Sequence, residues 1–141
     1  WQTSDGTMYR MGDLETEMQQ AYYDEYKNNI PQVDILFQPH HGRKSGAVPN
    51  DLLEALNPKL IIIGNAPFEH IDYGDSRQTI TQNAAGDIRF ENDGKEVHIY
   101  TKNKINNKPT CLKAKQGKGN ITRTVYGFSI VDWYYAGTLV V

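Results

Sequence analysis

One buried strand that ends in two adjacent histidines limits the folds open to this chain more than any other segment. Residues 33–42 read Val-Asp-Ile-Leu-Phe-Gln-Pro-His-His-Gly, and the apolar residues in the first half are typical of a mostly buried strand. Pro39 has no backbone N–H to donate to a neighbouring strand, and Gly42 lets the backbone turn. His40 and His41 are therefore predicted to lie at the carboxyl end of a strand, where ligands commonly bind in sheets covered by helices.

Strand-like and helix-like segments alternate on both sides of this strand. The order strand, helix, strand, helix, strand predicts parallel α/β units, and a third helix and a β hairpin follow. The first helix is expected to bury a face formed by Leu14, Met18, Ala21, Tyr22 and Tyr26. The expected elements are strands at 7–11, 33–38 and 60–63, helices at 14–28, 50–56 and from 75 or 76 to 84, and hairpin strands at 87–91 and 95–101.

Three groups that can bind metal follow three consecutive strands of the predicted sheet. Asp13 comes after the first strand, the histidine pair after the second, and His70 lies in the loop after the third. Because the carboxyl ends of parallel strands meet at one edge, we expect these side chains to converge there. Imidazole and carboxylate are ligands that suit zinc or another transition metal. A carboxylate that bridges two ions would give a two-metal site that activates water for hydrolysis.

Each of these residues also has a plainer interpretation. Asp13 can be the N-cap of the helix expected at 14–28, and a capping aspartate can still be a ligand. His40 and His41 can be ordinary turn residues, and His70 can be an exposed loop histidine. His98 alternates within a predicted hairpin strand and is interpreted as structural.

The loop after the histidine pair carries side chains that suit an anionic substrate. Arg43, Lys44 and Ser45 follow Gly42 directly. Guanidinium, ammonium and hydroxyl groups are common ligands of phosphate oxygens. These three residues are therefore candidates to contact a substrate phosphate.

Three segments resemble the C-terminal half of a metallo-β-lactamase-fold hydrolase, of the bacterial competence-protein type and its phosphodiesterase-like relatives. They are residues 11–15 (Met-Gly-Asp-Leu-Glu), 34–42 (Asp-Ile-Leu-Phe-Gln-Pro-His-His-Gly) and 56–63 (Leu-Asn-Pro-Lys-Leu-Ile-Ile-Ile), and the match extends over roughly residues 7–101. The resemblance implies an α/β fold that is half of an αβ/βα sandwich. Its expected parts are a mixed sheet with helices on one face, a C-terminal β hairpin and a tail.

The resemblance also implies roles for the candidate residues. Asp13 would bridge two metal ions, and His40 is the preferred last histidine ligand, with His41 contacting that ligand, or the two roles exchanged. The loop that holds His70 and Tyr73 would line the active site, with His70 contacting substrate or donating a proton to the leaving group. The implied cofactor is Zn²⁺, two ions in the full-length protein, with Mn²⁺ or iron as alternatives. The implied reaction is hydrolysis of a phosphodiester or another ester.

This sequence departs from the family pattern in its ligands. The main ligand motif of the family, His-x-His-x-Asp-His, does not occur in the 141 residues, and neither does the histidine usually found before the Gly-Asp pair. We therefore expect residues 1–101 to be the C-terminal half of a domain whose N-terminal half, in the same protein, completes the site. The piece alone is expected to be inactive. It is also expected to expose an apolar sheet face that pairs with the missing half or with a second copy.

The character of the chain changes at residue 102. Residues 102–120 are rich in Lys, Asn and Gly without an apolar period, and they are interpreted as a basic loop or linker. Residues 121–141 are strand-like and are interpreted as a β-rich C-terminal extension. Lysines followed closely by aromatic residues support an alternative function, a non-catalytic α/β binding module for nucleic acid, glycan or protein. The plainer interpretation of the lysines is a solvated loop.

Overall composition excludes several classes of protein. The net charge of −2 gives no global attraction to nucleic acid or to anionic membranes. No apolar run approaches the roughly 20 residues that a membrane-spanning helix needs. The single cysteine, Cys111, excludes a framework of internal disulfides.

Overall fold

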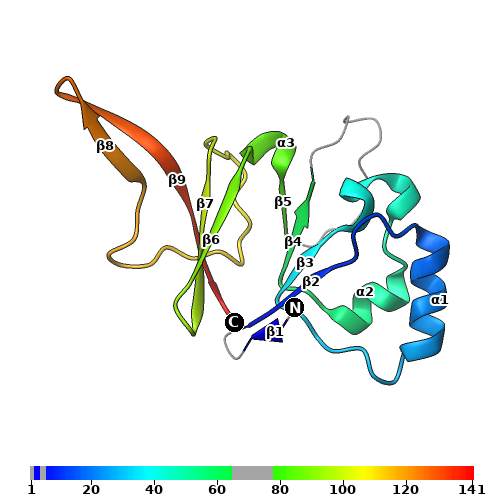
Figure 1. Cartoon of the computed structure of the whole chain (residues 1–141). Helices are drawn as coiled ribbons and strands as arrows, with labels where there is room; N and C mark the ends of the chain where they lie inside the picture. Colours follow the sequence, from blue (N-terminus) through cyan, green and yellow to red (C-terminus); the bar gives the residue numbers. More distant parts are fainter. Residues whose placement is uncertain (1, 4–5, 65–77) are drawn as a thin grey trace.

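The computed structural model describes residues 2–3, 6–64 and 78–141, and these residues form three layers (Figure 1). Two helices cover one face of a five-stranded sheet, and a four-stranded antiparallel sheet covers its other face. The first sheet has the order β1-β2-β3-β4-β5, and the second has the order β6-β7-β9-β8. The chain is therefore a mixed α/β protein, as the sequence predicts at this level.

The elements have the following bounds. The first sheet contains β1 (Gln2–Thr3), β2 (Gly6–Arg10), β3 (Ile35–Phe37), β4 (Leu60–Ile63) and β5 (Thr79–Thr81). The second contains β6 (Ile88–Asn92), β7 (Glu96–Thr101), β8 (Ile121–Val125) and β9 (Phe128–Val140). The helices are α1 (Thr16–Tyr26), α2 (Asn50–Leu56) and α3 (Gln82–Ala85), with short 3-10 turns η1 (Pro39–Gly42) and η2 (Lys44–Gly46).

The parallel α/β units predicted from the sequence are confirmed. Strands β2, β3, β4 and β5 pair in parallel, with Ile35 opposite Met8 on one side and Leu60 on the other. Strand β1 is antiparallel to β2, so the sheet is mixed. Parallel neighbours need crossover connections, and α1 and α2 supply them between β2 and β3 and between β3 and β4. The carboxyl ends of these strands consequently lie at one edge.

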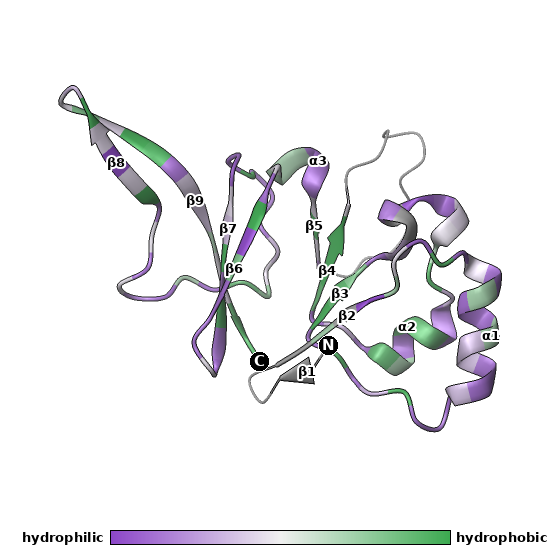
Figure 2. Ribbon diagram, in the orientation of Figure 1, coloured by the Kyte–Doolittle hydropathy of each residue, from purple (hydrophilic) through white to green (hydrophobic). Residues whose placement is uncertain are grey.

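Side chains of the central strands alternate between two apolar cores. Leu36 of β3 and Ile61 of β4 face the helices, where they pack with Leu52 and Leu56 of α2. Ile35 faces the second sheet, in a core shared with β4, β7 and β9. Because successive side chains of a strand point to opposite faces, a continuous apolar run is needed to fill both cores. In Figure 2, β4 is coloured hydrophobic, whereas α1 is coloured in a mixture of hydrophilic and near-neutral shades.

The prediction that one face of the sheet is exposed is wrong. Ile62 and Leu60 of β4 pack in one cluster with Val97 and Ile99 of β7 and Leu139 of β9, and all five are almost fully buried. Strand β9 reaches the core by pairing with β7 in antiparallel register. The face that was expected to need a second copy or the missing half is therefore covered by the β6–β7 hairpin together with the C-terminal segment that contains β9. This pairing joins residues on the two sides of position 101, where the character of the sequence changes.

Two of the predicted helices differ from the structure. The helix expected up to residue 84 begins only at Gln82, and residues 79–81 form strand β5 instead. Three consecutive β-branched residues favour a strand, and pairing with β4 satisfies their backbone groups. Helix α1 is shorter than the expected 14–28, and its N-cap is Glu15 rather than Asp13. The capping interpretation of Asp13 is therefore wrong.

The buried face of α1 also differs from the prediction. Gln19 is fully buried, whereas Met18 is 63% exposed and Tyr26 is exposed as well. The side-chain Nε2 of Gln19 donates to the backbone oxygens of Leu14 and Gly46, at 2.8 and 2.9 Å. These two hydrogen bonds satisfy the buried NH₂ group of Gln19, whereas its Oε1 has no hydrogen-bond partner among the described residues.

Residues 102–120 form the expected long loop, which apolar side chains attach to the body. Ile105 and Leu112 are buried in the core between the two sheets. Lys113 forms an isolated antiparallel bridge with Thr138 of β9. Beyond this bridge β8 and the first half of β9 form a hairpin that projects from the body (Figure 1). No helix among the described residues is long and apolar enough to cross a membrane.

Candidate functional site

Asp13 and His41 meet at the carboxyl edge of the parallel sheet. Asp13 follows β2, and His41 lies in η1, directly after β3. The Nε2 atom of His41 is 3.9 Å from Oδ1 of Asp13, and the side chains are 55% and 81% exposed. This separation is longer than a hydrogen bond but short enough for both atoms to approach one ion. Two of the residues predicted as metal ligands are thus brought together by separate crossovers.

A cleft of about 410 Å³ adjoins this pair and runs between the two sheets. Arg10, the last residue of β2, contributes a positive charge to its lining. Phe37 of β3 and Phe90 of β6 form an edge-to-face pair, with ring centroids 5.8 Å apart, that joins its two walls. The lining residues are Arg10, Gly12, Asp13, Phe37, Gln38, His41, Ile62, Gly64, Gln82, Ile88 and Phe90. The second sheet therefore supplies a wall that sequence reasoning did not assign to the site.

The backbone holds His41 in an unusual conformation. Its φ of +54° lies in the left-handed region, which non-glycine residues seldom adopt. Gly64, which follows β4, passes so close that a Cβ there would lie 2.9 Å from Nδ1 of His41 and 3.2 Å from its Cα. Strained residues of this kind are found preferentially at functional sites. Both features favour a functional interpretation of His41 over that of an ordinary turn residue.

The Asp13–His41 pair fits part of a metal site. Zinc binds imidazole nitrogen and carboxylate oxygen at about 2.0–2.2 Å, so tetrahedral ligand atoms lie about 3.3–3.5 Å apart. The observed 3.9 Å needs a shift of only a few tenths of an ångström, and both side chains are exposed enough to move. A catalytic zinc site normally has three protein ligands. The pair supplies two, fewer than such a site needs.

The other predicted site residues either lie outside the described residues or do not line the cleft. The side chain of His40, and the loop with His70 and Tyr73, lie outside the described residues. Arg43, Lys44 and Ser45 do not line the cleft. Instead the loop that contains them docks on α1, where Thr16 Oγ1 donates to the backbone oxygens of Ser45 and Ala47.

Sequence reasoning missed the positive charge and the second wall of the cleft. Arg10 could have been found, because it ends the strand that precedes the Gly-Asp pair. Phe90 and Gln82 gave no comparable signal, since their place depends on how the second sheet packs.

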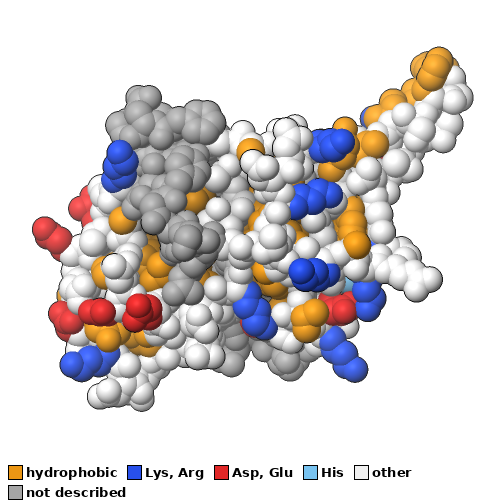
Figure 3. Space-filling model, turned by 180° about the vertical axis from the view of Figure 1, so that it is seen from behind, with side chains coloured by type: hydrophobic (Ala, Val, Ile, Leu, Met, Phe, Trp, Pro, Cys, Tyr) orange, Lys and Arg blue, Asp and Glu red, His pale blue; other side chains and the backbone are white. Residues whose placement is uncertain are grey.

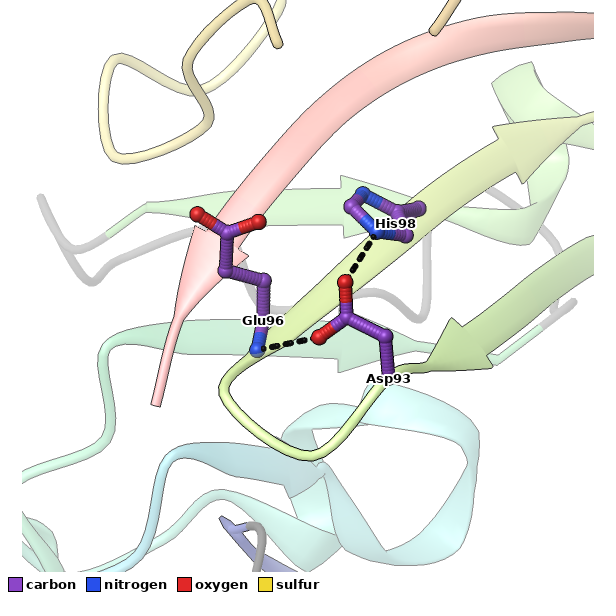
Figure 4. Close-up of side chains that lie close together, drawn as sticks. All are labelled: Asp93, Glu96 and His98. Atoms are coloured by element: carbon purple, nitrogen blue, oxygen red, sulfur yellow. Dashed lines mark hydrogen bonds and ion pairs between the residues drawn. The ribbon is translucent and has the colours of Figure 1, made fainter.

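A second group of polar side chains lies in the β6–β7 hairpin (Figure 4). The ligand atoms of Asp93, Glu96 and His98 all lie within 4.8 Å of one another. His98 is 2% exposed, and its Nδ1 and Nε2 lie 2.8 and 2.9 Å from Thr138 Oγ1 and Asp93 Oδ2. The Glu96 carboxylate is paired with the Lys115 ammonium at 3.0 Å. A metal would have to displace these partners, so we interpret the group as a structural tie, as predicted for His98.

The same tie makes one carboxylate unusually acidic. The hydrogen bond to His98, supported by the backbone N–H groups of Lys95 and Glu96, lowers the pKa of Asp93 from 3.8 to about 2. A carboxyl group whose pKa is lower in the folded state stabilises the fold above its unfolded pKa. That contribution is fully present above about pH 4 and is lost as the pH falls toward 2.

Replacing Asp93 by Asn is therefore expected to lower stability at about pH 5 more than at about pH 2. Urea unfolding of the wild type and of Asp93→Asn at both pH values would measure the difference. Asp51→Asn, at the exposed start of α2, is the matched control. Equal loss of stability by Asp93→Asn at both pH values would show that its ionised carboxylate does not hold the hairpin.

Comparison with known proteins identifies no relative. Family models, curated proteins and solved structures were searched, and none of them matches the chain. The role of the site is therefore argued from its own donor atoms, its cleft and its walls.

Proposed function

We propose that this chain carries the C-terminal half of a metal-dependent hydrolase site of the metallo-β-lactamase type, acting on a phosphodiester or another ester. The observation that carries the proposal is the 3.9 Å approach of Asp13 and His41, from separate crossovers, at the rim of a cleft. The sequence resemblance assigns ligand roles to the Gly-Asp and His-His-Gly segments. Their convergence supports those assignments, with His41 as the histidine ligand.

The layer order supports the same proposal. Helices, a mixed sheet and a second sheet lie on one another in that order. An αβ/βα sandwich has two facing sheets with helices outside each of them. The described residues correspond to three of these four layers, because the β6-β7-β9-β8 sheet takes the place of the second sheet that the missing half was expected to supply. We infer that the remaining helices and ligands come from an N-terminal half of the same protein.

The residues of the cleft have distinct proposed roles. Asp13 and His41 would hold zinc, which would supply Lewis acidity and a nucleophile derived from water near neutral pH. Arg10 attracts a negatively charged ester to the same cleft. Phe37 and Phe90 close the inner end against water with their paired rings. His70 and Tyr73 keep the proposed roles of proton donor and substrate contact.

The metal site can be tested in the chain itself by paramagnetic broadening. We expect substoichiometric Mn²⁺ to broaden the backbone NMR signals of Gly12, Asp13, His41 and Gly64 first. Asp13→Asn and His41→Ala should each weaken this effect at least about tenfold, because each removes one of two ligands. Gly64→Ala should weaken it too, since its added Cβ displaces His41 while keeping both ligands.

The matched control removes a carboxylate from the other polar group. Glu96→Gln should leave the broadening at Asp13 and His41 unchanged, because Glu96 belongs to the β6–β7 hairpin. Broadening centred on Asp93 and His98, or unaffected by Asp13→Asn, would contradict the assigned site. Zinc-dependent turnover of an aryl phosphodiester is expected only with the N-terminal half present, and turnover by the 141 residues alone would contradict the division of the site.

A further inference from the structure

The two ends of this molecule carry opposite charge. Residues 102–141 contain seven of the fifteen Lys and Arg but one of the seventeen Asp and Glu, a net charge of +6. Residues 1–101 hold the other eight and sixteen, a net charge of −8. Seen from behind, the basic side chains gather between the body and the projecting hairpin, and acidic ones gather at the opposite end (Figure 3). The overall charge of −2 thus hides a strongly basic surface.

Three lysines of the 102–120 loop lie beside β9. Lys102 Nζ donates to the backbone oxygen of Asp132, and Lys108 Nζ donates to that of Tyr135. Lys113 bridges to β9 at Thr138. Within the described part of the chain, five exposed lysines of the loop have no ion pair with a carboxylate, and their charge is therefore available to a partner. They are Lys102, Lys104, Lys108, Lys113 and Lys118.

Aromatic side chains continue this line onto the hairpin. Tyr126 and Phe128 at the hairpin end are 96% and 74% exposed. Nearer the body, Trp133 holds two cations at its ring, Lys102 at 5.0 Å and Arg89 at 5.9 Å from the centroid. Large apolar side chains this exposed on a hairpin are unusual unless they bind something. Their rings can accept the faces of planar groups.

We propose that the β8–β9 hairpin and the 102–120 loop bind single-stranded nucleic acid. Lysines spaced along β9 match the repeating charge of a phosphate backbone, and the exposed rings of Tyr126 and Phe128 match unpaired bases. An acidic protein would pair with the lysines but would leave the exposed rings unused. In duplex DNA the faces of the bases are stacked inside the helix, where the rings of Tyr126 and Phe128 do not reach them. The proposal concerns a different part of the molecule from the Asp13–His41 cleft and does not depend on it.

The test uses a fluorescent oligothymidine of about 20 nucleotides and anisotropy with the whole chain. Binding should weaken with salt, with a log–log slope of roughly −3.5 if five lysines contact phosphates. The double change Lys104→Glu and Lys118→Glu should weaken binding at least about tenfold at ~50 mM salt and make the slope shallower. Lys27→Glu, an exposed change just after α1, is the matched control and should have little effect.

The aromatic contribution is tested separately. Tyr126→Ala combined with Phe128→Ala should weaken binding at least about fivefold while leaving the salt slope unchanged. Tyr26→Ala, which removes an exposed ring from α1, should leave the affinity unchanged. Both hairpin residues are exposed, so the fold should persist, which thermal unfolding checks. No binding at low salt, equal affinity for duplex DNA, or insensitivity to the hairpin variant would each overturn the proposal.

Discussion

Truncating Ile99 to Ala is expected to be among the most destabilising single changes in this chain. Ile99 lies in β7, is fully buried, and packs between the two sheets. Removing its three outer carbons leaves a cavity at the sheet interface, which typically costs about 2–5 kcal/mol. In a chain of this size the midpoint of thermal unfolding should fall by roughly 8–20 °C. Calorimetry or circular dichroism would measure this change.

A matched control is available in the same sheet. Ile130 of β9 lies on the projecting hairpin and is 38% exposed. Ile130→Ala removes the same atoms from a site that water already reaches. The free energy of unfolding is therefore expected to fall by no more than about 0.5–1 kcal/mol. Similar losses in the two variants would contradict a core shared by both sheets. A much larger loss for Ile99→Ala would show that the core between the two sheets stabilises the chain.

Gly137→Ala is the second change expected to have a large effect. Gly137 has a φ of +142°, and an added Cβ would lie 2.7 Å from Cβ of Leu112, whose backbone is also within 3.4 Å. Backbone strain and overpacking together should cost about 2–4 kcal/mol. Because this contact attaches the 102–120 loop to β9, we also expect faster amide exchange in that loop. Urea unfolding with hydrogen exchange would test both expectations.

Substitutions at two other glycines distinguish backbone strain from overpacking as causes of the lost stability. Gly127 has a φ of +81° but open space around it. Gly127→Ala should therefore lower the free energy of unfolding through backbone strain alone, by about 1–2 kcal/mol. Gly119 has neither a positive φ nor a neighbour within 4 Å, and Gly119→Ala should be close to neutral. If Gly137→Ala cost no more than Gly127→Ala, the close approach of Leu112 would not matter to stability.

The meeting of Asp13 and His41 could be predicted from the sequence. The apolar run before Pro39 and the helix at 50–56 are local patterns, and both elements form as expected. Parallel pairing then follows from the alternation of strands and helices. Once the strands are parallel, Asp13 and His41 must share one edge, because each follows a strand end directly.

The rest of the site could not be predicted, because it depends on residues far apart in the chain. Phe90 faces Phe37 only because the second sheet packs on the first. That packing in turn needs β9 to pair with β7 after a long loop. Gln19 was missed for the same reason, since the carbonyl of Gly46 that accepts a hydrogen bond from its buried NH₂ group belongs to another loop.

The sequence by itself determined the order of β2, α1, β3, α2 and β4, the edge at which Asp13 and His41 meet, and the basic character of the C-terminal segment. Only the tertiary structure decided that this segment joins the β6–β7 hairpin in covering the apolar face of the sheet and leaves an aromatic hairpin in solvent. The physical reason is the range of the interactions. Local periodicity selects a strand or a helix from neighbouring residues, whereas the burial of a sheet face depends on which distant strand pairs and packs most favourably.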